Sequence, residues 1–349
     1  MNRLDDIVEL DPCTDGRWDL FVSRHPRASI FHRTAWLDAL RQTYGYRTAA
    51  YGRVSVSGEL LGGILLSEVK SWLTGRRMVS LPFADHCEPL VDDSEELRAL
   101  LAQVMKERDR RRWRYIEIRP LTTRFSDTAG SPSRKFVLHR LDLSATMEEL
   151  FRKLHVDSIR RKIQKAGKSG LMVRSGRASD LLADFYRLHV HTRKRQLSPP
   201  HPFVWFRNVV KCLGESACIR VAYKDDIAAA SVFTLETGTT VVYKYGCSDE
   251  RFHSLGAMPF VFWDMIQSAK VAGKRELDLG RSDLDNPGLI AFKEKWGAQG
   301  QPLIYSRTPA VDTVLERGAK SVSSLKGFIR HCPDWLLISA GRLLYPHLG

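Results

Sequence analysis

The sequence is short of cysteine and has no CxxC pair among its six cysteines. Zinc sites and small disulfide scaffolds depend on grouped cysteines, so we interpret these as reduced thiols. A secretory signal is also missing, because the opening stretch MNRLDDIVEL carries acidic residues where a basic and then an apolar stretch are needed. No uncharged apolar run approaches the ~20 residues that span a bilayer. We therefore expect a cytoplasmic protein that is soluble or peripheral to a membrane.

Acidic residues are outnumbered by basic ones, and the formal net charge is +14. Net charge says nothing about the fold, but it favours anionic partners such as nucleic acid, nucleotide-linked substrates and acidic lipids. The sequence contains no helix-turn-helix, zinc-finger or RNP-like string. A nucleic-acid-binding protein without catalysis is therefore an alternative that rests on charge alone.

The 349 residues, 43% of them hydrophobic, suffice for two domains of about 150 residues each. Both halves show one order of predicted elements, in which strands joined by tight turns precede a helix and a last strand. In the first half these are strands 47–56, 59–69 and 78–81, a helix from 95 to 112 capped by Ser94, and strand 115–119. In the second half they are strands 217–224, 227–236 and 240–245, a helix with Pro259 in its first turn and Gly273 after its end, and strand 276–279.

The last strands of the two halves also match in pattern, RYIEIRP at 114–120 against RELDLGR at 275–281. Each places an acidic residue, Glu117 or Asp278, between two aliphatic residues, so that it faces the opposite side of its strand. This echo suggests a duplicated α/β unit, although the same order is common in α+β proteins. We predict domains at 1–145 and 146–310, with a separate tail at 311–349.

A strongly basic stretch, RKLHVDSIRRKIQKAGK, fills residues 152–168 and is predicted to form one cationic helix. Its apolar positions leave one side free to dock, while Arg160, Arg161 and Lys162 project outward. A solvated charged face is the ordinary explanation of such a run. The near absence of acidic neighbours favours a phosphate-binding site instead.

Residues 280–298, GRSDLDNPGLIAFKEKWGA, read as a loop that leaves a strand end and enters a short helix. Ligands commonly bind at such loops, so Arg281 and Lys293 are candidates to face a bound anion, unless each is an ordinary surface charge. Tyr243 and Tyr245 are predicted to share one strand face, either as packing residues or as hydroxyls that orient a substrate. The run DHCE at 85–88 is not expected to bind a metal, because consecutive residues converge poorly on one ion.

Several stretches resemble the Fem-type aminoacyl transferases and the wider Fem-like, GNAT-fold proteins found with exopolysaccharide (PEP-CTERM system) gene clusters. They are SIFHRTAWLDALRQTYGY at 29–46, LPFADHCEPLVD at 81–92, RRKIQKAGKSGL, VVYKYGCSDERF, the Asp278 strand with its following segment, and the terminal GRLLYPHLG. The resemblance covers most of the chain. It implies two tandem GNAT-like domains, with mixed sheets flanked by helices and without the coiled-coil arm of some relatives.

The resemblance also implies an activity, the transfer of an amino acid from aminoacyl-tRNA to an amine of a peptidoglycan precursor. Phe292 and Lys293 match the FK motif of the family, whose lysine is thought to stabilise negative charge at the transfer centre. Arg160 falls in the basic helix used for the phosphate or nucleotide of the precursor, and Tyr243 and Tyr245 fall on the cleft strand.

The chemistry of acyl transfer agrees with these assignments, because an amine that attacks an ester or thioester passes through an oxyanion and must lose a proton. Asp278 is a candidate proton acceptor, and equally a candidate structural hydrogen-bond partner. An acyltransferase acting on a peptidoglycan or exopolysaccharide intermediate is our main hypothesis. A noncatalytic scaffold of a polysaccharide assembly is an alternative.

The donor is left open by the segment RFHSLGAMPF at 251–260. Acetyl-CoA enzymes of the GNAT fold have a glycine-rich loop whose backbone amides hold the pyrophosphate, and only one glycine stands here. This weakens acyl-CoA and suits aminoacyl-tRNA, for which a basic surface is also appropriate. No tightly bound cofactor is expected with either donor.

The last stretch, 324–349, combines Lys326, Arg330 and Arg342 with Trp335 and several leucines. Such a composition is typical of interfacial helices on anionic membranes. The competing interpretation is an amphipathic helix that packs on the body of the protein.

Overall fold

The computed structural model describes residues 6–72, 74–125, 128, 130–310 and 332–349. The chain forms two compact units. Among the described residues, unit 1 comprises 6–135, 303–310 and 342–349, and unit 2 comprises 136–302 and 332–341. This division differs from the predicted boundary at residue 145, because the chain changes unit inside two long strands, β6 (Ser131–Asp142) and β12 (Gln299–Thr308).

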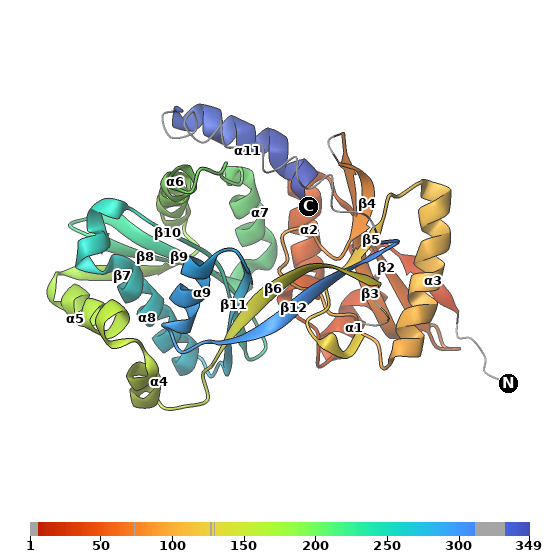
Figure 1. The fold of residues 1–349 in the computed structure, drawn as a ribbon, viewed down its shortest axis with the longest axis horizontal. Coiled ribbons are helices and arrows are strands. Elements are labelled where there is room, and N and C mark those ends of the chain that lie inside the picture. Colours follow the sequence, from red (N-terminus) through yellow and green to blue (C-terminus); the bar gives the residue numbers. More distant parts are fainter. Residues whose placement is uncertain (1–5, 73, 126–127, 129, 311–331) are drawn as a thin grey trace. The chain divides into compact units, whose positions relative to one another are not determined.

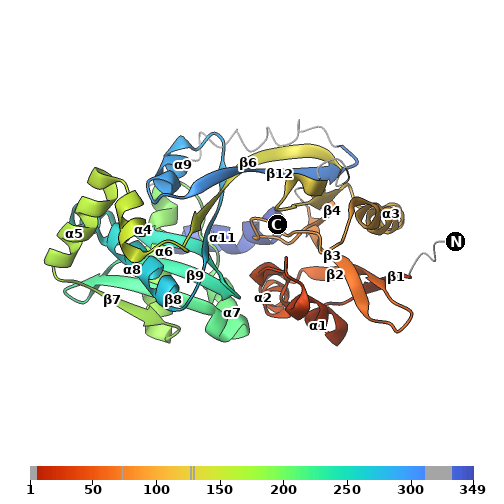
Figure 2. The same cartoon turned by 90° about the horizontal axis from the view of Figure 1, so that it is seen from below.

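Unit 1 is a mixed sheet with the strand order β1-β2-β3-β4-β5-β12, in which only β4 and β5 run parallel. Helix α3 covers one face of this sheet, and α1 and α2 cover the other (Figure 2). The strands before β12 are β1 (Ile7–Leu10), β2 (Arg47–Val54), β3 (Leu60–Ser71), β4 (Gly75–Val79) and β5 (Ile116–Ile118). The helices are α1 (Gly16–Arg24), η1 (Ile30–His32), α2 (Thr34–Tyr44), α3 (Ser94–Arg111) and η2 (Thr123–Phe125).

The turn between β2 and β3 and the start of α3 in unit 1 form close to where the sequence predicts them. Gly58 has a φ of 83° in the turn between β2 and β3, a conformation that favours glycine. The cap of α3 is Asp93 and not the predicted Ser94, since the Asp93 carboxylate accepts hydrogen bonds from the N–H groups of Glu95 and Glu96. A carboxylate at this position also interacts favourably with the helix dipole.

Unit 2 contains the strand order β6-β11-β10-β9-β8-β7, in which only β10 and β11 run parallel. Figure 1 shows α5 and α8 on one side of these strands and α6 and α7 on the other. The further strands are β7 (Leu171–Gly176), β8 (Ala217–Lys224), β9 (Ile227–Thr237), β10 (Thr240–Ser248) and β11 (Glu276–Asp283). The helices are α4 (Met147–Lys153), η3 (Val156–Arg160), α5 (Arg161–Lys168), α6 (Ser179–Arg195), α7 (Phe203–Leu213), η4 (Gly214–Ser216), η5 (Glu250–Leu255), α8 (Ala257–Val271) and α9 (Pro287–Glu294).

The predicted single helix over 152–168 is wrong. Helix α4 ends at Lys153, and a π turn, η3, precedes α5. The side chain of His155 accepts a hydrogen bond from the N–H of Ser158 and caps the new start, which no charge pattern reveals. Two predicted turns do form. Asp225 and Asp226, before β9, have φ of 49° and 62°, and Gly273, after α8, has a φ of 71°.

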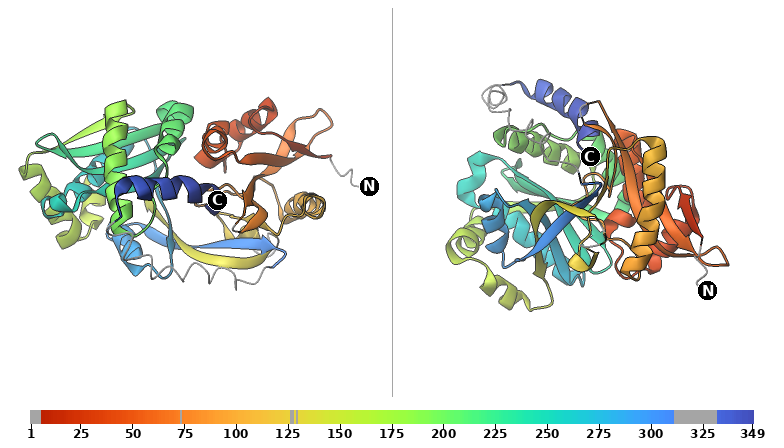
Figure 3. Two further views of the ribbon diagram at one scale, coloured as in Figure 1. Left: turned by 90° about the horizontal axis from the view of Figure 1, so that it is seen from above. Right: turned by 45° about the vertical axis from the view of Figure 1, so that its right-hand side comes forward.

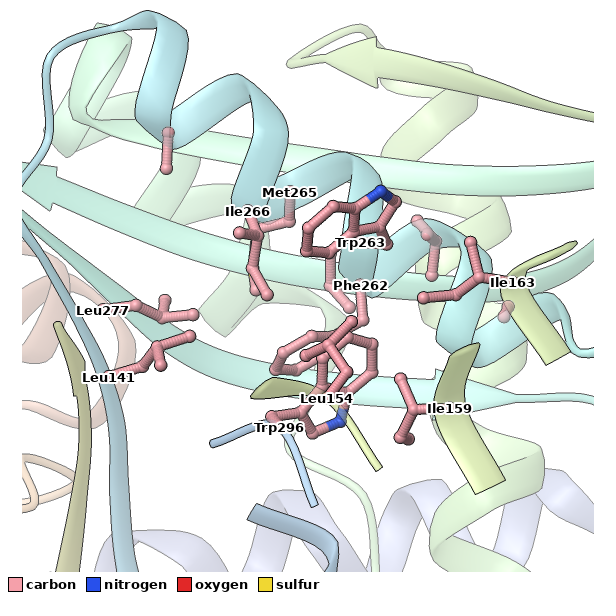
Figure 4. Close-up of a cluster of buried hydrophobic side chains, with 14 of the residues drawn as sticks. Leu141, Leu154, Ile159, Ile163, Phe262, Trp263, Met265, Ile266, Leu277 and Trp296 are labelled. Carbon is pink, nitrogen blue, oxygen red and sulfur yellow. The ribbon is translucent and has the colours of Figure 1, made fainter. Parts of the chain in front are cut away.

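The core of unit 2 joins α5 and α8 to β6, β9 and β11 (Figure 4). The rings of Phe262 and Trp296 lie 4.2 Å apart between centroids, and Leu141 and Leu277 approach from the two strands. Burial of each such side chain contributes about 1.5–3 kcal/mol. This packing fixes the strand ends at which the candidate site lies.

The predicted tail contains the helix α11 (Asp334–Leu348). Lys326 and Arg330 lie outside the described residues, so the basic half of the predicted interfacial segment has no structural account. The end of α11 lies beside β4 in unit 1 (Figure 3). Within the described part of the chain, no helix is long and apolar enough to cross a membrane.

Candidate active site

The candidate site of unit 2 begins where β10 and β11 stop pairing. Their parallel register ends with Val242 opposite Asp278, although β10 continues to Ser248 and β11 to Asp283. Ligands of mixed and parallel sheets bind outside the carboxyl ends of such strands. Both strands are also irregular here, with register shifts between Tyr243 and Tyr245 and between Asp278 and Arg281.

Lys293 is buried, with 2% of its surface exposed, and is not the ordinary surface charge that sequence left open. Its Nζ donates hydrogen bonds to the carbonyl oxygens of Gly280, at 2.7 Å, and Arg281, at 2.9 Å. These carbonyls belong to the irregular part of β11, between Asp278 and Arg281. Lys293 therefore links α9 directly to this part of the strand. A cation held in this way supplies positive charge without reorganisation.

Phe292 places Lys293 by packing. Its ring meets those of Phe262 and Trp296 at centroid distances of 5.8 and 6.4 Å, both nearly perpendicular. Pro287 at the start of α9 and the Asn286 side chain, which accepts a hydrogen bond from Leu289 N–H, set where this helix begins. The aromatic half of the FK pair thus anchors α9 on the core.

Asp278 is buried, and its side chain contacts the backbone of its own strand. Its Oδ1 accepts a hydrogen bond of 2.7 Å from the N–H of Gly280, whose φ is 70°. The carboxylate therefore stabilises the irregular backbone that carries the two carbonyls bound by Lys293. This contact has a structural role.

Arg281 contributes its backbone to the Lys293 contact and directs its side chain elsewhere. The guanidinium lies 4.2 Å from the centroid of the Phe136 ring, on the partner strand β6. Stacking of this kind holds a cation in a fixed direction. Lys293 thus contacts the backbone carbonyl of Arg281, while the Arg281 guanidinium stacks on Phe136.

Tyr243 and Tyr245 lie on opposite faces of β10, which corrects the prediction that they share one. The bulge inserts Lys244, so Tyr243 pairs with Thr234 and Tyr245 with the adjacent Phe233 on β9. The Tyr243 ring packs 5.1 Å from Phe262 of α8, and burial raises its pKa.

On the other face, the Tyr245 hydroxyl accepts a 2.9 Å hydrogen bond from Trp205 Nε1. Its ring packs against Phe185 of α6 and Phe206 of α7. Tyr245 thus belongs to the aromatic packing beneath α6 and α7, and only Tyr243 lies on the α8 side.

The basic residues 160–162 lie beside the turn that precedes α8. Gly256 has a φ of 77°, and a Cβ there would come 2.7 Å from the carbonyl oxygen of Lys162. Arg161 is exposed and pairs with Asp157 at 2.7 Å, whereas Arg160 is half-buried. The first turn of α8 has Gly256 as its cap, without a capping side chain among the described residues. Cations and uncapped N–H groups together favour an anion at this point.

His139 is a site residue that the sequence did not reveal. It stands on β6 opposite the irregular part of β11, between Leu138 and Arg140, whose partners are Arg281 and Asp278. The side chain is fully buried, and its pKa is lowered by burial and further by the charge of Lys293. A lone histidine in a strand carries no signal of such a position.

The DHCE run of unit 1 makes protein contacts. The Glu88 carboxylate accepts hydrogen bonds from the N–H groups of Leu121 and Thr122 and from the Thr122 hydroxyl. The His86 ring meets Phe31 edge-on at 5.6 Å. In the described part of the chain, no three histidine, cysteine or acidic residues form a group that could hold a metal ion.

Comparison with known proteins identifies the type of domain. Residues 153–294 match the family described as acetyltransferase (GNAT) domain, a range that contains every predicted site residue. No curated protein sequence matches the chain.

Solved structures extend the likeness over most of the chain. The chain is similar to FemX, with a TM-score of 0.67 at 16% identity over 86% of this chain and 96% of that one. It is similar to the C-terminal domain of a putative lysylphosphatidylglycerol synthetase from Agrobacterium fabrum, with a TM-score of 0.60 at 16% identity, over 88% and 95%. A tandem GNAT protein from the clavulanic acid biosynthesis pathway gives a TM-score of 0.56 at 12% identity, over 88% and 99%.

These matches confirm the predicted fold, two tandem GNAT-like units with mixed sheets flanked by helices. They also confirm an acyltransferase of GNAT type. The exopolysaccharide-associated branch remains a prediction.

Proposed function

We propose that the protein transfers an acyl or aminoacyl group to an amine of a cell-envelope precursor, either a peptidoglycan or an exopolysaccharide intermediate. The observation that carries this proposal is Lys293, buried on α9 and bound to two carbonyls of β11 that lie just beyond the last residue paired with β10. The envelope acceptor is supported by the likeness to FemX and to a protein named for lysylphosphatidylglycerol synthesis.

The reaction requires the site to stabilise an oxyanion and to accept a proton. The acceptor amine attacks the carbonyl carbon of an ester or thioester, a C–N bond forms, and the carbonyl oxygen becomes an oxyanion. The C–O or C–S bond then breaks, and the hydroxyl or thiol that leaves takes up a proton. Lys293 would stabilise the oxyanion, a role in which one fixed donor is worth about 3–4 kcal/mol. Asp278 would accept the proton of the amine.

The remaining predicted residues would bind the substrates. Arg160, Arg161 and Lys162 would hold the phosphate or nucleotide of a substrate beside the start of α8. Tyr243 would orient the substrate. Arg281 would support the site by stacking on Phe136 of β6, and Tyr245 by its place in the aromatic packing.

Aminoacyl-tRNA is our first choice of donor, because the turn before α8 is a short 3-10 helix with the single glycine Gly256. Acyl-CoA is the alternative, for an N-acetyltransferase that acts on a sugar amine. A specific observation favours it: the start of α8 has no capping side chain among the described residues and lies beside Lys162. GNAT domains also generally use acyl-CoA.

The test is transfer from radiolabelled acetyl-CoA or charged tRNA to candidate acceptors by the purified protein. With the active donor, Lys293→Ala is expected to lower kcat about 100- to 1,000-fold, as removal of an oxyanion donor does. Lys295→Ala is the matched control, because Lys295 is exposed two residues further on. Unchanged turnover or an unchanged cellular phenotype in Lys293→Ala would favour a noncatalytic scaffold or nucleic-acid-binding role.

We also propose that the protein works at the inner face of the cell membrane, in contact with anionic lipids. The net charge of +14 supports this location. Cosedimentation of the full chain with anionic vesicles measures it.

A further inference from the structure

His139 on β6 is a buried histidine whose ring nitrogens take no part in the hydrogen bonding of the fold. Its side chain is fully buried, and within the described residues neither Nδ1 nor Nε2 has a hydrogen-bond partner. A buried polar group without a partner costs free energy, and an apolar residue of similar size would pack there without that cost. The stability of β6 therefore does not explain a histidine at this position.

The His139 ring lies on the face of the sheet that α9 covers. Side chains two residues apart on a strand share a face, so His139 shares the face of Leu141, which belongs to the core on which Phe292 of α9 packs (Figure 4). The register of β6 and β11 places Ser282 on this face as well, and Asp278 on the opposite one. His139 is thus on the Lys293 side of the sheet, and Asp278 is not.

The part of β11 that Lys293 binds lies directly opposite His139. In the register of the two strands, the single residue His139 stands against two residues, Leu279 and Gly280. Lys293 Nζ donates its hydrogen bonds to the carbonyl oxygens of Gly280 and Arg281, in and just after this bulge. Burial lowers the pKa of His139, and the positive charge of Lys293 lowers it further. A cation and a titratable ring therefore share one buried place.

Among the described residues, the charges that act on the His139 ring come from α9. Glu294 is exposed and raises the pKa of His139, by less than burial and Lys293 lower it. The neighbouring strands bring uncharged residues, Ser282 on β11 and Gly300 on β12, where a Cβ would lie 3.3 Å from His139 Nε2. With a pKa below the ordinary value of about 6.5, the ring is neutral near neutral pH.

We propose that His139 is a positioning residue for Lys293. In its neutral form the ring leaves the Lys293 ammonium on the carbonyls of Gly280 and Arg281, and in its protonated form it displaces the ammonium from them. The physical reason is repulsion, because two cations in one buried place of low dielectric disfavour each other. His139 is fully buried, so it acts through Lys293 and does not touch a substrate. This role rests on the function proposed for Lys293 and makes that function dependent on pH.

The first test measures the coupling of the two groups without an assay of transfer. In the full chain with isotope-labelled histidine, NMR follows the imidazole signals as pH is changed, and the His139 signals are those that His139→Gln removes. In Lys293→Met, which keeps an unbranched side chain and removes the charge, the midpoint of the His139 titration should move to higher pH. In Lys295→Met it should stay, because Lys295 is exposed two residues further on. The same midpoint in Lys293→Met as in the wild type would overturn the proposal.

The second test follows kcat against pH with the active donor. At about pH 8, His139→Gln should lower kcat about tenfold, because the amide fills the place of the ring only in part and Lys293 is placed less well. The KM of the acceptor should not change, since the residue acts on Lys293 and not on the substrate. His191→Gln, exposed on α6, is the matched control and should have the kcat of the wild type.

The dependence of this effect on pH separates positioning from a merely structural role. The acceptor amine titrates with both proteins, so the ratio of wild-type to His139→Gln kcat isolates His139. This ratio should fall as the pH drops below the midpoint measured by NMR, because protonation then impairs the wild type alone. A ratio that stays constant with pH would overturn the proposal. His139→Asn replaces His139→Gln in both tests if the longer amide does not fold.

Failure here is separable from failure of the proposed function. If Lys293→Ala transfers normally, the function proposed for Lys293 is wrong, and the NMR titration still decides whether the two groups are coupled. If Lys293→Ala is inactive while the His139 midpoint is the same in Lys293→Met and the wild type, only the role of His139 is wrong.

Discussion

In unit 1 the parallel strands β4 and β5 end their register with Val79 opposite Glu117, and in unit 2 β10 and β11 end with Val242 opposite Asp278. Both acidic residues come from the matching strands RYIEIRP and RELDLGR. Glu117 accepts 2.8 Å hydrogen bonds from Nε of Arg119 and of Arg307, the latter on β12. Asp278 accepts one from backbone, beside a buried lysine. The carboxylate of unit 1 is thus bound by two arginines, and that of unit 2 by a backbone N–H of its own strand.

Under the function proposed above, unit 2 would carry the reaction and unit 1 would not. Burial raises the pKa of Glu117, but the charges of Arg119 and Arg307 outweigh it and hold that pKa below its ordinary value. Such a carboxylate stays charged and paired and cannot serve as a proton acceptor near neutral pH. Its contribution is to the stability of unit 1.

The largest effect is expected from Glu117→Ala, which leaves two arginines without their shared carboxylate. Removing one partner of a buried ion pair costs about 3–5 kcal/mol of unfolding free energy. Urea unfolding measures it, with the exposed Glu250→Ala as a control of about 0.5 kcal/mol or less. A Glu117 variant of normal stability that has lost transfer activity would reverse the roles given to the two units.

Asp278→Asn should affect catalysis instead of stability. The amide oxygen can still accept the Gly280 hydrogen bond, so the shape of β11 is kept, but the proton acceptor is lost. We expect kcat to fall about 100-fold, with a melting temperature close to that of the wild type. If kcat changes by less than about threefold, Asp278 is only structural and the two acidic residues are more alike than proposed.

Buried histidines are a feature that both units share. In unit 1 His32 lies 2.9 Å from the Glu88 carbonyl, and burial lowers its pKa to about 4. In unit 2 His189 lies among aromatic rings, and burial, with the charge of Arg193, lowers its pKa to about 3.

A lowered histidine pKa means that the unfolded chain binds the proton first, so stability falls as pH drops below about 6.5. His189 should account for about 2 kcal/mol of loss between pH 6.5 and 5. His189→Phe should flatten the dependence of melting temperature on pH, whereas His191→Gln, exposed on the same helix, should not. Parallel pH curves for wild type and His189→Phe would contradict this.

The smallest effects should distinguish the two faces of β10. Tyr245→Phe leaves the Trp205 indole without its hydroxyl acceptor and should cost about 1 kcal/mol of stability. Tyr243→Phe should change stability by less than about 0.5 kcal/mol and should act on the KM of the acceptor. Equal effects of both variants on KM would contradict the assignment of the substrate contact to Tyr243 alone.

Much of the fold was predictable because its signals are local. The turns at Gly58, at Asp225 and Asp226, and at Gly273 follow from which residues tolerate positive φ. Strands and helices follow from their periodicity. The break before α5 was missed because it depends on one side chain, His155, that competes with the helix for a backbone N–H.

Part of the candidate site was also predictable, since the Phe292–Lys293 pair and the Asp278 strand stand out by resemblance and by pattern. The positions of the two tyrosines were not. A one-residue bulge reverses every side chain after it, and its presence depends on how the neighbouring strand pairs.

The duplicated order of elements, the excess of basic residues and the residue types available for acyl transfer can all be seen in the amino-acid sequence. Three features needed the folded chain: Lys293 is buried on the carbonyls of Gly280 and Arg281, Glu117 is neutralised by Arg307, and β6 and β12 each belong in part to both units. Local sequence sets local conformation, whereas these contacts join residues 12 to 190 positions apart. Their free energy exists only once the strands are packed.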